Sequence, residues 1–80
     1  MDLHEFIFKK LNNKENYYIA FHDMEVSISH SIIIQGIRYS TQLVIDKMNY
    51  FNDDAKWSKL DKHINAFIKQ STSIEKLFGN

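Results

Sequence analysis

The segment "VSISHSIIIQGIRYSTQLVID", residues 26–46, carries two apolar alternations separated by the pair Gln35-Gly36. Before this pair the even positions are apolar apart from His30, and serine dominates the odd positions. After it Ile37, Tyr39, Leu43 and Ile45 place apolar residues on odd positions, and Val44 is the one apolar residue on an even position. A period of two is typical of strands that bury one face, and a two-residue turn at Gln35-Gly36 would fold the two strands into a hairpin.

The turn and the apolar pattern lead independently to the same register. The turn pairs apolar residues on one face throughout: Val26 with Ile45, Ile28 with Leu43, Ile32 with Tyr39 and Ile34 with Ile37, with His30 opposite Thr41. The pairs on the other face are Ser27 with Val44, Ser29 with Gln42, Ser31 with Ser40 and Ile33 with Arg38. A helix through Val26, Ile33, Ile37 and Val44 is the alternative, but it uses β-branched residues and serines of poor helix propensity. We therefore predict a β-hairpin.

The N-terminal third predicts a short helix followed by a strand. In "DLHEFIFKKLNN", Asp2 and Glu5 have the spacing of a capping box, apolar residues follow at helical intervals, and Asn12-Asn13 can end the helix. In "ENYYIAFHD", Ile19 and Phe21 alternate with residues that would point to the opposite face.

The last third reads as helix, with Asn52 as N-cap and Asp53-Asp54 in the first turn. The apolar stripe is Trp57, Leu60, Ile64, Phe67 and Ile68, flanked by lysines. Thr72 and Glu75 form a second capping-box pattern, which predicts a break and a short final helix that ends at Gly79.

The predicted order is α-β-β-β-α, with a possible extra terminal helix, in one domain over residues 1–80. This is an α+β fold with a three-stranded antiparallel sheet whose one face is covered by the helices. The other face would be mostly polar and open to water, Ser27 included.

Composition narrows the class of protein. The chain has no cysteine, which excludes disulfides and thiolate metal sites, and "MDLHEF" lacks an apolar signal core, so we expect a cytoplasmic protein without a membrane span. Ten basic and ten acidic residues balance, so bulk charge favours neither a nucleic-acid binder nor a nucleic-acid mimic. Heavy use of Ile, Lys and Asn indicates AT-rich coding, typical of low-GC bacteria and their phages.

No residue pattern indicates catalysis. The four histidines lack the paired spacing of a zinc site, and no phosphate-binding glycine loop or nucleophile motif is present. His30, on the core face beside Thr41, is interpreted as a buried histidine that bonds to a neighbour, and the alternative is a catalytic or pH-sensing role, which would need a carboxylate beside it in a cleft. The other three histidines are interpreted as surface residues. Asp23 and Glu25 fit a tight turn between strands. We expect no enzyme activity, no cofactor and no metal.

The polar sheet face is the candidate binding surface. It contains tyrosine and arginine, the residue types that most often anchor protein interfaces. The candidate contact residues are Tyr18, Ser29, Ser31, Arg38, Ser40 and Gln42. A second copy of the chain could pair through a sheet edge or through this face.

In layout the chain resembles the small phage-encoded anti-CRISPR inhibitors. The resemblance lies in "DLHEFIFKKLNNKENYYIAF", the hairpin and "FNDDAKWSKLDKHINAFI", and spans most of the chain without a diagnostic motif. It implies a non-catalytic inhibitor that occludes a surface of a host protein, and it assigns no individual residue. The alternative function is a nucleic-acid-binding regulator that uses the lysine-flanked helix from Lys56 to Lys69.

Overall fold

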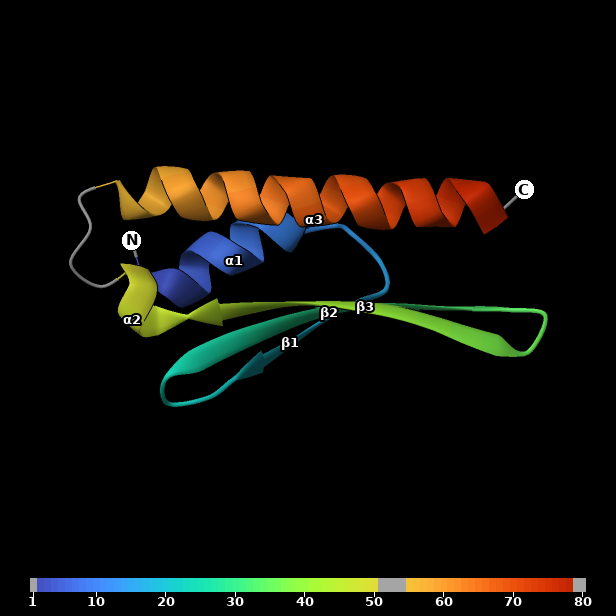
Figure 1. Cartoon of the computed structure of the whole chain (residues 1–80), viewed down its shortest axis with the longest axis horizontal. Helices are drawn as coiled ribbons and strands as arrows, with labels where there is room; N and C mark the ends of the chain where they lie inside the picture. The colour runs from blue at the N-terminus through green and yellow to red at the C-terminus, as the bar shows by residue number, and fades with distance from the viewer. Residues whose placement is uncertain (1, 51–54, 79–80) are drawn as a thin grey trace.

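The computed structural model describes residues 2–50 and 55–78 of the chain. Its elements are, in order, α1 (Leu3–Leu11), β1 (Tyr17–Phe21), β2 (Glu25–Ile34), β3 (Ile37–Asp46), α2 (Lys47–Tyr50) and α3 (Lys56–Phe78). The strands form one antiparallel sheet in the order β1-β2-β3, and α1 and α3 lie on the same side of it (Figure 1). The predicted α+β architecture is confirmed.

The hairpin forms in the predicted register. Ile34 pairs with Ile37, His30 with Thr41 and Val26 with Ile45. Gln35 and Gly36 both have positive φ, 52° and 79°, as a type I′ turn requires. This turn matches the right-handed twist of the two long strands, so local backbone geometry and side-chain alternation specify the same pairing.

The core lies between the sheet and the two long helices. Its buried apolar residues come from α1, β2, β3 and α3, and are Ile7, Leu11, Val26, Ile28, Ile45, Leu60, Ile64 and Phe67. Trp57 and Ile68, also predicted for the α3 stripe, are partly buried and pack against this cluster. At the start of α1 the Asp2 carboxylate accepts a hydrogen bond from the Glu5 N–H at 2.8 Å, which confirms the predicted N-cap.

Two expectations for the C-terminal third need correction. α3 runs without a break to Phe78, so the predicted stop at Thr72 and the separate final helix are wrong. Ser71 and Ser73 donate to the carbonyls of Phe67 and Lys69 one turn earlier, so their hydroxyls do not cap a new helix. The short helix α2 was not predicted from the sequence. At its start the Asp46 carboxylate accepts a hydrogen bond from the Met48 N–H. The predicted cap Asn52-Asp53-Asp54 and the predicted end at Gly79 lie outside the described residues.

Candidate functional site

The six predicted contact residues come together on the face of the sheet that the helices leave uncovered. Together with Thr41 they line one shallow depression with a volume of about 500 Å³. They come from all three strands, and the depression is lined by Tyr18, Ser29, Ser31, Arg38, Ser40, Thr41 and Gln42.

The register arranges these residues in rows across the sheet. Tyr18, Ser29 and Gln42 form one row, because Ser29 pairs with Tyr18 on β1 and with Gln42 on β3. In the next row, Ser40 Oγ donates to Ser31 Oγ at 3.2 Å. The central strand carries the half-buried hydroxyl groups of Ser29 and Ser31, and the longer exposed side chains of Tyr18, Arg38 and Gln42 lie on the flanking strands. The depression therefore has a floor of hydroxyl groups between taller rims.

Tyr18 and Arg38 supply the two largest side chains of these rims. Tyr18 is 60 % exposed although it is aromatic. Arg38 is the chain's one arginine, and its guanidinium makes no hydrogen bond or ion pair with any residue of the described ranges. A planar cation that lacks a partner is suited to a carboxylate, which it can bind through two parallel hydrogen bonds.

Apolar side chains flank the polar residues on this face. Ile33 lies beside Arg38, and Val44 follows Gln42 along β3, and both are at least half exposed. An exposed mixture of aromatic, aliphatic and arginine side chains is typical of the centre of a protein interface.

Ser27 corrects one detail of the predicted face. It has the expected orientation, but only 8 % of its surface is exposed, so the prediction that it is open to water is wrong. It lies on the central strand between Ala20 and Val44. Its short side chain is therefore covered by its neighbours, and the polar surface begins one row further along, at Ser29.

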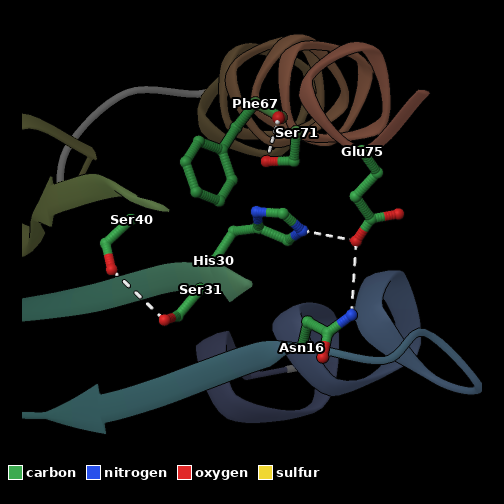
Figure 2. Close-up of polar contacts among 7 residues, drawn as sticks. All are labelled: Asn16, His30, Ser31, Ser40, Phe67, Ser71 and Glu75. Atoms are coloured by element: carbon green, nitrogen blue, oxygen red, sulfur yellow. Dashed lines mark hydrogen bonds and ion pairs between the residues drawn. The ribbon is translucent and has the colours of Figure 1, made fainter. Parts of the chain in front are cut away.

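His30 forms a second polar cluster, on the core side of the sheet. Its ring is 1 % exposed, which confirms the predicted burial, while His4, His22 and His63 are exposed as expected. The hydrogen-bond partner is Glu75 of α3, whose Oε1 lies 2.6 Å from His30 Nε2 (Figure 2). The Asn16 side chain donates to the same oxygen at 3.4 Å. One carboxylate thus joins the end of α3 to β2 and to the loop before β1.

The hydrogen bond from His30 lowers the pKa of Glu75 below its ordinary value of 4.5, and the Asn16 bond acts in the same direction, while burial opposes both. A histidine–carboxylate pair is also found in acid–base catalysis, and His30 lines a pocket of about 380 Å³ together with Thr41 and Ile74. Here the ring lies between Tyr17, at 4.9 Å between centroids, and α3. The geometry is that of an internal tie between helix and sheet.

The bond between Glu75 and His30 was not predicted, because the spacing of Thr72 and Glu75 was interpreted as a capping box. If α3 is extended past Thr72, the stripe Ile64, Phe67, Ser71 continues by helical spacing to Glu75, which places that carboxylate on the core side. Ser71, 0 % exposed, lies on the same stripe. This helical spacing was the signal in the sequence that could have placed Glu75 on the core side of α3.

The side of α3 that faces away from the core is basic. Lys59, Lys62, Lys69 and Lys76 are exposed and recur at intervals of three and seven residues, which places them along one helix face. The two carboxylates of the helix turn to other elements: Asp61 forms an ion pair with Lys10 of α1, and Glu75 bonds to His30. The local charge of this surface is positive although the chain is neutral overall.

Within residues 2–50 and 55–78, no three His, Asp or Glu side chains are grouped as metal ligands, and no helix is both long and apolar enough to cross a membrane. Comparisons with protein-family models, with curated proteins and with solved structures gave no match to this chain.

Proposed function

We propose that this protein is a non-catalytic binding module whose contact surface is the polar sheet face, and that it acts as a phage- or mobile-element-encoded inhibitor by occluding a surface of a host protein. The observation that carries the proposal is the gathering of Tyr18, Arg38 and Gln42 around a floor of serine hydroxyls on the uncovered side of the sheet. The layout-level resemblance to anti-CRISPR inhibitors supplies the class of target, a host protein complex.

The chemistry of this face favours a partner that presents a carboxylate. Arg38 makes no ion pair with a described residue, and the hydroxyls of Ser29, Ser31 and Ser40 can donate to an acceptor. Ile33 and Val44 add apolar area beside them. A protruding acidic side chain with an aliphatic neighbour would bury surface on this face without leaving its charge unpaired.

Replacing Arg38 and Gln42 together with alanine is expected to weaken binding to the captured partner about tenfold or more, because interface arginines commonly contribute more than about 1 kcal/mol. Both side chains are exposed, so the Tm should shift by less than about 4 °C. The measurement is affinity capture of the tagged chain from a low-GC bacterial lysate treated with nuclease, followed by titration with the partner identified by mass spectrometry.

The matched control changes two exposed residues on the other side of the molecule, Lys62→Ala/Lys69→Ala. It should leave binding to a protein partner within about twofold of the unmodified chain, as expected for residues outside the interface. If the Arg38/Gln42 variant binds as tightly as the unmodified chain, the polar sheet face is not the contact surface.

The basic face of α3 favours a second candidate function, a regulator that binds nucleic acid. Four exposed lysines lie along about 25 Å of helix axis, from Lys59 to Lys76, at a rise of about 1.5 Å per residue. Phosphate contacts from lysine are independent of sequence and release counterions.

If this second function operates, the logarithm of affinity for a labelled DNA or RNA duplex falls with the logarithm of salt concentration, by about 0.9 per phosphate neutralised. Lys62→Ala/Lys69→Ala should reduce the slope by about 2. Fluorescence anisotropy between about 50 and 200 mM salt measures both quantities. A slope of zero in the unmodified chain would exclude this mode of binding.

A further inference from the structure

The outer edge of β3 carries backbone groups that have no hydrogen-bond partner among residues 2–50 and 55–78. The Ser31 N–H bonds to the Asn16 carbonyl, on the β1 side, so the odd positions of β2 bond toward β1 and the even positions toward β3. The even positions of β2 pair with the odd positions of β3. The N–H and C=O groups of Arg38, Ser40, Gln42 and Val44 therefore point away from the sheet, and no described residue bonds to them.

This edge lacks the features that normally prevent strand pairing. From Tyr39 to Ile45 the strand contains no charge, proline or glycine. The opposite edge, β1, is half as long, with five residues against ten, and the rings of His4 and Phe8 from α1 lie against its last residue, Phe21. β3 is thus the edge that is open over its whole length.

A groove runs between this edge and α3. Its volume is about 530 Å³, and its apolar part is formed by Leu43 of β3 with Ala66 and Phe67 of α3. An added strand would place alternate side chains on the core side of the sheet, and this groove lies where they would project. The small side chain of Ala66 leaves room on the helix side.

We propose that a second copy of this chain adds to the β3 edge, so that two β3 strands pair antiparallel about a twofold axis at Gln42. In the pairing of the two β3 strands, even positions of one copy must face even positions of the other. Any other register would place core-side residues of one copy on the polar face of the shared sheet. Two such registers overlap over nine residues of β3, with the axis at Thr41 or at Gln42.

Charge selects the axis at Gln42. In that register Arg38 of one copy lies directly opposite Asp46 of the second copy, and symmetry repeats the pair at the other end. With the axis at Thr41, Arg38 would face Val44 and Asp46 would lie beyond the paired region. Asp46 and Arg38 are both exposed, and neither forms an ion pair within the described residues. Opposite charges in facing positions stabilise antiparallel pairs.

The resulting assembly has one continuous six-stranded sheet, built from two three-stranded sheets. An axis perpendicular to the sheet keeps both α3 helices on one side and both polar faces on the other. The inference does not depend on the proposed function, because the pairing is measurable with the purified chain alone. The two interactions compete for Arg38, which faces Asp46 of the second copy in the dimer and is available to a partner's carboxylate in the single chain.

Gln42→Lys tests the proposed axis. It places two lysines directly opposite each other across the twofold, which weakens antiparallel pairing. Analytical ultracentrifugation of the unmodified chain should show a concentration-dependent species of twice the chain's 9.5 kDa. The variant should dissociate at concentrations about tenfold higher or more, in line with the loss of the one Gln42–Gln42 contact and the gain of one repulsive contact in its place.

Ser29→Lys is the matched control, because Ser29 is the register partner of Gln42 but lies on the central strand, away from the edge. It adds the same charge and should leave dimerisation unchanged. A chain that stays monomeric at all concentrations overturns the proposal and leaves the edge to an extended segment of another protein. Equal dimerisation of Gln42→Lys and the unmodified chain also overturns it.

Reversing both members of the ion pair tests the register separately. Arg38→Asp and Asp46→Arg should each weaken the dimer, and the double variant should restore it, because it recreates opposite charges in both facing positions. Circular dichroism of each variant checks that the fold is retained, since the Asp46 carboxylate also accepts from the Met48 N–H at the start of α2. A double variant no better than the single ones excludes the register about Gln42.

Discussion

Replacing Ile28 with alanine is expected to lower the free energy of unfolding by about 2–5 kcal/mol, the range measured for large-to-small changes in cores. Ile28 is 0 % exposed and lies on the central strand, between Ile19 of β1 and Leu43 of β3. The helices cover it from the core side, so the lost methyl groups leave a cavity that the sheet cannot close by relaxing toward solvent. Urea denaturation monitored by circular dichroism measures the change.

The loss expected from Ile28→Ala is a large fraction of the total free energy of unfolding, which is about 4–12 kcal/mol for a domain of this length. Trp57 provides a second probe, since its ring packs on Phe6 of α1 at 5.0 Å between centroids and reports on the helix layer. Coincident transitions from both probes would show that sheet and helices unfold together.

Ile33→Ala is the control for this prediction. Ile33 lies on the same strand, has the same side chain and is 62 % exposed on the opposite face. Its replacement should change the free energy of unfolding by no more than about 0.5 kcal/mol. Equal losses from the two variants would contradict the assignment of the sheet's two faces.

The hairpin could be predicted in full because two independent constraints coincide there. Gln35-Gly36 fixes the turn, and the apolar parity on both strands fixes the faces, so a one-residue slip would violate both. The position of the six candidate residues on one face follows directly from that register, and the structure confirms their shared location. What they bind stays a proposal, since parity specifies a surface and carries no information about its partner.

The remaining features depend on contacts that are distant in sequence. Thr72 and Glu75 fit a local cap, but Glu75 bonds to His30, 45 residues earlier in the chain. The hydrogen bond from Glu75 to the buried His30 ring stabilises the fold more than a capping interaction at Thr72 on the helix surface would. α3 also contains no glycine or proline that would end it there. Likewise, Ser27 has the expected orientation but is buried, because side-chain alternation specifies which face a residue lies on and does not specify how exposed it is there.

Replacing Glu75 with alanine is expected to reduce the free energy of unfolding at pH 7 by about 1–2 kcal/mol, because it leaves the buried His30 ring without its acceptor. This expected loss lies in the lower part of the range for a buried polar group left without a partner, because the Glu75 side chain is itself 38 % exposed and partly screened by solvent. Glu75→Gln retains an oxygen that can accept from Nε2–H and should lose about half as much. Urea titrations at pH 7 measure both variants.

The same pair predicts how stability depends on pH. Because the folded-state pKa of Glu75 lies below its ordinary value of 4.5, the ionised carboxylate stabilises the fold above that pH. The contribution is lost as the pH falls from 4.5 through the lower folded-state pKa. The stability difference between the unmodified chain and Glu75→Gln should therefore shrink as the pH falls below 4.5, where the carboxylate becomes protonated. A difference that does not change between pH 4.5 and 3 would mean that the His30–Glu75 hydrogen bond does not stabilise the carboxylate.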